Sequence, residues 1–397
     1  MNSTQPSVSK RNRTTRYLIE GTSALLLAIL VTLGVGLHFT RPPIRYSSQP
    51  ASQGTTVQAR VLTAETAQTS SDESEMFTLS QELTLEILSP GEYQGEEITL
   101  TYNGIGPSPE LVSFQAGEKA LVRISQRPDG GSEESLTIYA VADHVRLLPL
   151  GILAGVFCLA TIFVGRWQGL RALLGLGLTA LLIGGFILPQ ILAHRDPVTV
   201  TLIGAALLLG LTLYLIQGWN LAGHTAFLSM LISLLFTGLL AILWTHLAHM
   251  TGFGSEETMY LQSTGVTVEM RGLLLAGIIL GAAGVLDDVV LAQAVAVFEF
   301  AAANPALNRR ALYRHGMEVG IAHLTSMVNT LFMAYASVAL PLIILFYLYA
   351  EPWYLTLNRE LIAEEVLRTL IGSLGLMGAV PLTTLFAAWV APLASAS

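Results

Sequence analysis

Long apolar runs fill most of this 397-residue chain after residue 146 and decide what it can fold into. A helix that crosses the hydrocarbon core of a bilayer needs about 20 predominantly apolar residues. Runs of this kind cover residues 17–37, 147–165, 171–192, 198–216, 221–247, 272–296, 320–349 and 366–391. Charged residues make up only 12% of the chain, whereas soluble domains average about 25%. The sequence therefore predicts an α-helical polytopic membrane protein with eight transmembrane helices, one for each run.

The distribution of basic residues predicts how these helices are oriented. Cytoplasmic loops carry an excess of lysine and arginine. Basic residues precede the first run and flank the predicted inner loops: Lys10, Arg11, Arg13, Arg16, Arg166, Arg171, Arg309, Arg310 and Arg314. The loops at 248–270 and 350–365 carry mostly acids. We therefore expect both chain termini to be cytoplasmic. The outer turn His194–Pro197, which carries Arg195, fits this orientation least well.

A soluble segment follows the first run, so three parts are expected: residues 1–38, 39–145 and 146–397. Five short runs that alternate or are rich in β-branched residues are separated by turn-rich pieces, a pattern that predicts a small extracytoplasmic all-β domain. An OB-like barrel is one candidate topology. Residues 40–144 contain six basic and fifteen acidic side chains. This acidity suits a solvated domain or attraction of cations, and it disfavours nucleic acid as a partner.

Two adjacent acids, Asp287 and Asp288, interrupt one of the apolar runs. Acids inside hydrocarbon are costly and almost always face a bundle interior or a wet cavity. One helical stripe carries Asp288 together with three glycines: Gly277, Gly281 and Gly284. Because glycines let a neighbouring helix approach closely, the stripe predicts that Asp288 points into a helix contact. Asp287 lies about 100° further round the helix, so the two acids need not share a role.

Two interpretations of the acidic pair remain open. In the first, the acids lie inside the membrane on a proton or ion pathway, because residues 272–286 alone are too short to span it. In the second, they lie at the headgroups and are simply solvated. The run that starts near residue 320 favours the first interpretation, because it is unusually polar and lies at a similar depth. Its candidate partners for the acids are His323, Ser326, Asn329 and Thr330.

Other polar residues have ordinary interpretations. Arg368 is expected near the outer surface beside Glu364, four residues away. His246 and His249 are too few to bind zinc without further ligands. No P-loop, zincin or nucleophile motif occurs, so we expect no enzyme, no cofactor and no metal.

The runs GAAGVLDDVVLAQAVAVFEFAAANP and ALYRHGMEVGIAHLTSMVNTLFMAYASVALPLIILF, with RTLIGSLGLMGAVPLTT, resemble the YibE/F family of bacterial multi-span membrane proteins. The resemblance covers roughly residues 145–391 and implies the bacterial cytoplasmic membrane, but it implies no settled activity. The acidic span, the basic loop and the polar span are also similar to the SecD/SecF and resistance-nodulation-division exporters. That second resemblance implies proton-coupled movement with Asp287 and Asp288 as proton carriers. The lysine counter-charge of those exporters is absent, and two extra spans precede the acidic one.

The leading hypothesis is a secondary transporter or export-assisting protein in the lipid bilayer, which moves a proton or another small ion or solute. The rival hypothesis is a structural or sensory membrane protein whose extracytoplasmic β-domain binds a protein partner.

Overall fold

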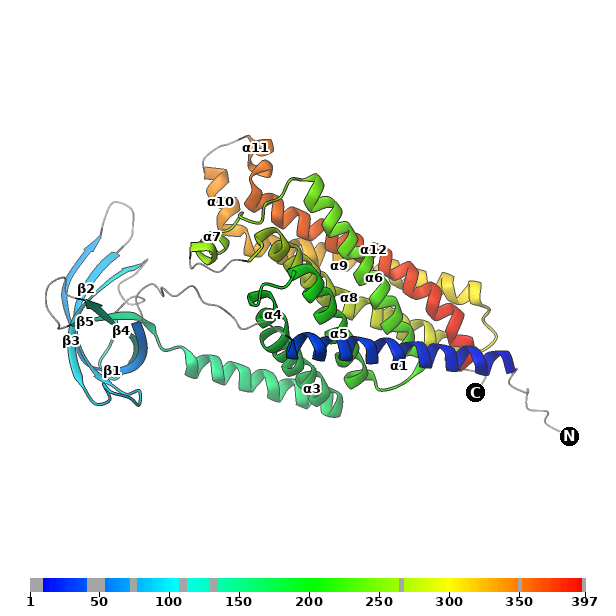
Figure 1. Ribbon diagram of the computed structural model, residues 1–397, viewed down its shortest axis with the longest axis horizontal. Helices are drawn as coiled ribbons and strands as arrows, with labels where there is room; N and C mark the ends of the chain where they lie inside the picture. Colours follow the sequence, from blue (N-terminus) through cyan, green and yellow to red (C-terminus); the bar gives the residue numbers. More distant parts are fainter. Residues whose placement is uncertain are drawn as a thin grey trace. The chain divides into compact units, whose positions relative to one another are not determined.

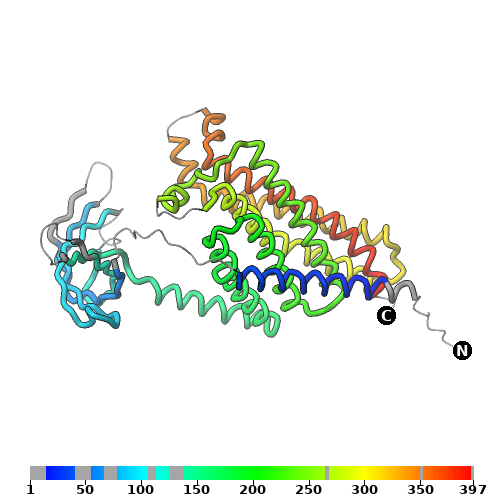
Figure 2. Tube along the Cα trace, viewed as in Figure 1, coloured from blue at the N-terminus to red at the C-terminus, as the bar shows by residue number. Residues whose placement is uncertain are grey.

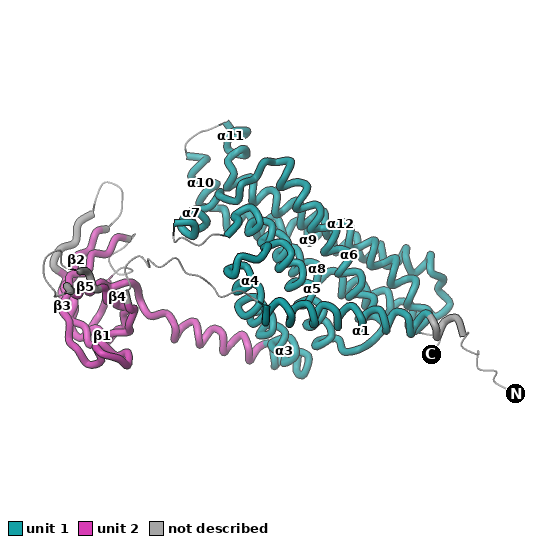
Figure 3. The backbone as a smooth tube through the Cα atoms, in the orientation of Figure 1, with its two compact units in different colours: residues 1–47, 161–397 teal, residues 48–160 magenta. Residues whose placement is uncertain are grey.

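The computed structural model describes residues 10–40, 54–71, 77–106, 113–128, 135–263, 268–348 and 352–394. The chain divides into two compact units, one of residues 48–160 and one of residues 1–47 and 161–397 (Figure 3). The first unit contains the described strands, and the second contains most of the helices.

The smaller unit is built on one antiparallel sheet (Figure 1). Its strands are β1 (Gly54–Ser71), β2 (Phe77–Ile87), β3 (Glu97–Gly106), β4 (Lys119–Pro128) and β5 (Ser135–His144). They lie in the order β3-β2-β1-β4-β5, and β3 also contacts β5. The sheet is therefore a nearly closed barrel, and the all-β domain that the alternating runs predict is confirmed.

The barrel core follows from the alternation of side chains along each strand. Apolar residues from four of the strands and one loop form the buried cluster: Val57, Ala59, Val61, Leu83, Leu85, Ile87, Ile98, Phe114, Ala120, Val122 and Ile124. Gln81 is also buried, and its side-chain amide pairs with the backbone of Phe114, accepting at 2.9 Å and donating at 3.3 Å. This pairing satisfies the buried amide and fixes the loop before β4.

The larger unit is helical. Its elements are α1 (Lys10–Phe39), the second part of α3 (Leu147–Leu182), a π-helical turn η1 (Ile183–Ile187), α4 (Leu188–Leu192), α5 (Pro197–Gln217), α6 (Leu221–Leu247), α7 (Glu256–Ser263), α8 (Met270–Ala303), α9 (Arg309–Val338), α10 (Leu340–Leu348), α11 (Trp353–Asn358) and α12 (Glu360–Ala394). Among the described residues, seven helical stretches are long and apolar enough to cross a membrane. α1 packs against α5 and α6 (Figure 2).

Two of the eight expected runs form one continuous candidate span, residues 147–192. The backbone inside it leaves helical geometry at Arg166, with φ 47° and ψ −122°. Gly169 lies so close to the Thr161 carbonyl oxygen that a side chain there would collide with it. In an unbroken helix, residues eight apart lie about 12 Å apart along the axis. The chain therefore turns back at Arg166, inside the predicted inner loop.

α8 is the centre of the helical unit, since it packs against α5, α6, α9 and α12. Branched side chains dominate its buried face, among them Ile278, Ile279, Leu286, Val289 and Val290. Close packing of these side chains against four neighbours positions the acidic pair that follows Leu286.

The helix expected at residues 320–349 has different bounds in the structure at both ends. α9 begins earlier, at Arg309, because the Asn308 side chain accepts the Ala311 backbone N–H (2.9 Å) and so caps a polar first segment of the helix. α9 ends at Val338, and α10 begins at Leu340 after a turn at Ala339. Pro341 lacks a backbone N–H and therefore cannot continue the helical ladder across this point.

Candidate functional site

The acidic pair lies near the middle of the 34-residue α8. Asp287 is partly buried, and its Oδ1 atom is buried without a hydrogen-bond partner among the described residues. Asp288 is exposed. The expectation that Asp288 points into a helix contact is therefore wrong, and Asp287 is the acid that turns toward the bundle. The two carboxyl groups differ in environment, as their 100° separation around the helix allows.

The glycine stripe of α8 does not carry the packing that its spacing predicts. A Cβ at Gly277 or Gly284 would meet no described atom within 4 Å, and only Gly281 lies against another helix, with the Tyr335 hydroxyl 3.2 Å from its Cβ position. The branched apolar face of α8 binds the neighbouring helices instead. Close approaches through glycine occur on α9, where Gly316 and Gly320 lie against α8 and α12.

The polar face of α9 is exposed: His323, Ser326, Asn329 and Thr330. The described hydrogen bonds of these residues stay within α9, such as Thr330 Oγ1 to the Ser326 carbonyl at 3.1 Å. Asn329 Nδ2 reaches only the Met333 sulfur, at 3.8 Å. Among the described residues, no hydrogen bond joins this face to the acids. A hydroxyl that bonds to the carbonyl four residues back satisfies itself within its own helix.

A buried polar contact that the sequence analysis did not identify joins α8, α9 and α12. Gln293 is 4% exposed, and its Nε2 donates to the Gly316 carbonyl and to Thr384 Oγ1, both at 2.7 Å. Thr384 Oγ1 donates in turn to the Val380 carbonyl at 2.6 Å. The signal available in the sequence was a lone glutamine inside an apolar run, about one and a half turns after the acids.

His224 is a second buried polar residue that no sequence motif indicates. It is fully buried near the start of α6. Its Nδ1 atom lies 3.0 Å from the Tyr214 hydroxyl on α5, and its ring packs edge-on against Trp219. Its Nε2 atom has no partner among the described residues. His224, rather than the exposed His323, is therefore the histidine held inside the helical unit.

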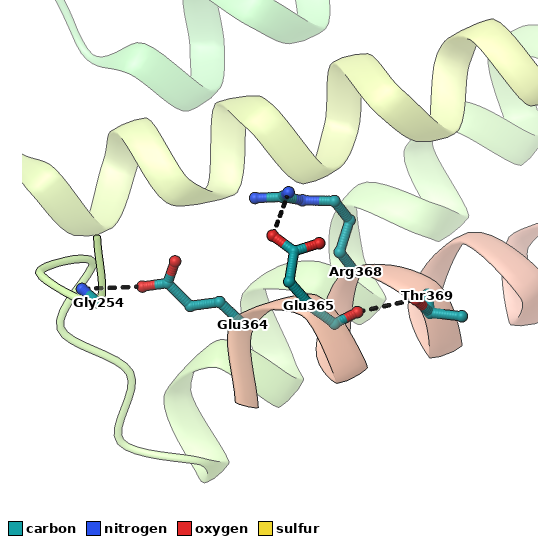
Figure 4. Close-up of polar contacts among 5 residues, drawn as sticks. All are labelled: Gly254, Glu364, Glu365, Arg368 and Thr369. Carbon is teal, nitrogen blue, oxygen red and sulfur yellow. Dashed lines mark hydrogen bonds and ion pairs between the residues drawn. The ribbon is translucent and has the colours of Figure 1, made fainter. Parts of the chain in front are cut away.

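Two glutamates at the start of α12 hold the loop between α6 and α7. Glu360 Oε1 accepts the backbone N–H groups of Thr251 (2.5 Å) and Gly252 (2.8 Å). The buried Glu364 accepts the Gly254 N–H at 3.2 Å (Figure 4). Because carboxylates bind backbone N–H groups strongly, this arrangement fixes the loop to α12.

Arg368 pairs with Glu365, three residues away, at 2.7 Å (Figure 4). The expected partner, Glu364, is instead bound to the loop. Positions three and four residues back both lie on the same helix face, so spacing alone could not choose between them. The guanidinium carbon of Arg368 also lies 6.0 Å from the centre of the Tyr335 ring on α9.

In the smaller unit, an exposed ion pair precedes α3. Arg146 Nη1 donates to Asp143 Oδ2 at 2.6 Å, and the His144 backbone N–H donates to Asp143 Oδ1 at 2.8 Å. The Arg146 hydrogen bond, followed by the backbone one, lowers the pKa of Asp143. The same pair raises the pKa of Arg146.

Asp287 has a carboxyl oxygen without a partner in the part of the chain that the structure describes, within a helix apolar enough to cross a membrane. An unpaired buried carboxylate is unfavourable, and such a group binds a proton, an ion or water.

A protein-family model described as YibE/F-like protein matches residues 153–393. Comparisons with curated proteins and with solved structures found no match.

Proposed function

Since this match covers more than half of the chain, the protein belongs to the YibE/F-like family, and we propose that it is a proton-coupled transporter or export-assisting protein. The family resemblance carried by its last third is thereby confirmed, and the candidate spans agree with a multi-pass membrane protein. One observation supports the coupling role: the buried, unpartnered Oδ1 of Asp287 in the central helix α8. Ionisable residues inside spans commonly serve proton or ion pathways.

Asp287 acts as the proton carrier in this proposal, and the exposed Asp288 acts as the group through which it exchanges protons with water. A carboxyl group that alternates between charged and neutral forms changes its preference for a polar surrounding. Protonation can shift a helix between two positions only if the charged and the neutral carboxyl group differ in which of the two positions they favour.

The proposal includes eight spans with both termini in the cytoplasm of a bacterium. The helical stretch 147–192 would be about 69 Å long if straight, more than twice the hydrocarbon thickness of about 30 Å. The turn at Arg166 supports its division into two spans. The β-domain, for which we infer OB-type connectivity from the strand order and the β3–β5 contact, then lies outside the cytoplasm.

The test compares Asp287→Asn with Asp288→Asn in proteoliposomes that contain the full chain and an enclosed pH-sensitive dye. With an imposed proton gradient, we expect Asp287→Asn to lower protein-dependent proton movement at least about tenfold, since a step that needs the carboxyl group is lost. Asp288→Asn should have a smaller effect. Wild-type proton movement in Asp287→Asn would refute the coupling role.

The rival function is a structural or sensory one in which the β-domain binds a partner. It is favoured by the separate core of that domain. It predicts that deletion of residues 60–143 abolishes function in cells while Asp287→Asn has no effect there. The transport proposal requires the opposite result for Asp287→Asn.

A further inference from the structure

A groove of about 460 Å³ with apolar walls lies between α1, α6 and α12. Its lining includes Ile19 of α1, Leu228 of α6, and Phe386 and Trp389 of α12. The volume falls within the range of sites that hold small molecules. Because apolar walls alone do not select an occupant, the polar group nearest to the groove decides what it binds.

The groove lies at one end of the helical bundle. Its lining residue Thr225 is four residues after the start of α6, and Trp389 is five residues before the end of α12. These separations correspond to about 6 and 7.5 Å along the helix axes. The start of α1 and the end of α12 lie at this same end (Figure 1). Since all three helices are candidate spans, the groove lies near the level of the lipid headgroups, where tryptophan is enriched.

A cation lies beside this groove. The guanidinium carbon of Arg309, the first residue of α9, is 4.6 Å from the centre of the Trp389 ring. Arg309 is exposed, and its side chain has no ion-pair or hydrogen-bond partner among the described residues. A guanidinium presents five N–H donors in a planar fork that matches the oxygens of a phosphate. The donors of Arg309 are therefore accessible to a phosphate group at headgroup level.

The neighbouring charges favour a phosphate whose headgroup carries no ammonium. Arg310 is exposed and, like Arg309, adds an uncompensated positive charge in the described part of the chain. Glu20 follows the lining residue Ile19, but it is paired with Arg16 at 2.8 Å, so these two charges compensate each other. A zwitterionic headgroup would bring an ammonium close to two arginines, whereas a glycerol headgroup brings the phosphate with no opposing charge.

We propose that this groove binds an anionic phospholipid. The phosphate accepts from the Arg309 guanidinium, and an acyl chain lies along Leu228, Phe386 and Trp389. A soluble phosphate would leave these apolar walls uncovered, so the groove and the cation together select a lipid. The proposal does not depend on proton coupling, so it and the proposed function can fail separately.

The test is quenching of Trp389 fluorescence by phospholipids with brominated acyl chains, with the full chain in phosphatidylcholine vesicles. The chain has five tryptophans, so the emission of Trp389 is measured as the difference between the wild type and Trp389→Phe. Brominated phosphatidylglycerol should quench Trp389 at about a fivefold lower mole fraction than phosphatidylethanolamine with the same chains, the preference that one cation near the surface provides. Equal quenching by the two lipids would show an ordinary lipid contact and overturn the proposal.

Matched variants separate the Arg309 contact from general attraction to a basic surface. Arg309→Gln should abolish the preference for phosphatidylglycerol. Arg310→Gln removes the same charge from the next residue, which makes no contact with a groove residue among the described contacts, and it should keep most of the preference. Arg309→Lys should keep part of it, because lysine retains the charge but not the planar fork. Equal losses in Arg309→Gln and Arg310→Gln would contradict the site.

Glycerol phosphate in the buffer distinguishes the lipid from a free phosphate. It should leave quenching by brominated phosphatidylglycerol unchanged, because a soluble compound buries no apolar surface in the groove. Loss of quenching on its addition would show that the headgroup alone is bound, and it would refute the part of the proposal that assigns the groove to an acyl chain.

Discussion

Glycines of α9 lie close to two neighbouring helices, and substitution of one of them tests the packing of α9 against α8 and α12. A methyl group at Gly316 would lie 2.7 Å from Thr384 Cγ2 on α12 and 2.7 Å from Val297 Cγ2 on α8. Carbon atoms in contact normally stay about 3.5–4.0 Å apart. Gly316→Ala must therefore displace two side chains at once.

The expected cost follows from that overlap. Over-packing typically costs about 1–3 kcal/mol, and both neighbours are β-branched residues with little rotamer freedom. Alanine recovers up to about 1 kcal/mol through its better helix propensity. We expect Gly316→Ala to lower the free energy of unfolding by about 1–2 kcal/mol.

Gly284→Ala is the matched control, because a Cβ there meets no described atom within 4 Å. It gains the same propensity term without the overlap, so it should be neutral or stabilising. The difference between the two variants isolates the helix contact. The measurement is equilibrium unfolding of the full chain in mixed detergent micelles, followed by tryptophan fluorescence.

Thr384→Ser supplies a rescue, because it removes the Cγ2 methyl and keeps the hydroxyl that binds Gln293. In the Gly316→Ala background it should recover about 1 kcal/mol relative to its effect alone. Equal costs for Gly316→Ala and Gly284→Ala, or the absence of any coupling to Thr384→Ser, would refute the α9–α12 packing.

Three further results are expected. Glu360→Ala should speed hydrogen exchange of the two loop amides that it binds by about tenfold or more, and unchanged exchange would argue against the loop attachment. Asp143 should titrate below the usual value of about 3.9 in carbon-13 spectra; its stabilising contribution is present above that value and lost as pH falls through the lowered pKa, and Arg146→Gln should raise this pKa. In a cysteine-free chain, Ser326→Cys should react with a water-soluble thiol reagent faster than Ile321→Cys, and equal rates would show that water does not reach the polar face of α9.

The helices and strands were predictable from the sequence where the hydrophobic pattern identifies both the type of element and its buried face. The strands of the β-domain alternate apolar and polar residues, so both their existence and their inward faces follow from the period of two. The length of the apolar runs predicts the candidate spans in the same way, including the turn at Arg166 between two of them. The exception is the run that is divided near Pro341.

The packing faces of the spans were not predictable by the same means. α8 is apolar on nearly every side, so its pattern does not indicate which face binds its neighbours. The glycine stripe was the remaining indication of a packing face. The face that packs is instead the branched one, because Ile278, Val289 and Val290 bury more apolar surface against four helices. The sequence could not show whether Arg368 pairs with Glu364 or with Glu365, because helix residues three and four positions apart are both neighbours on the helix surface.

Asp287 of α8 differs from the unpartnered hydroxyl groups of the helical unit. Buried hydroxyls such as those of Thr201 and Ser233 lack a partner as placed, but a rotation lets each donate to a carbonyl of its own helix. Deprotonated Asp287 has only acceptors, and a helix interior offers no free backbone N–H to bind them. Its Oδ1 atom must therefore take a proton, an ion or water from outside its own helix.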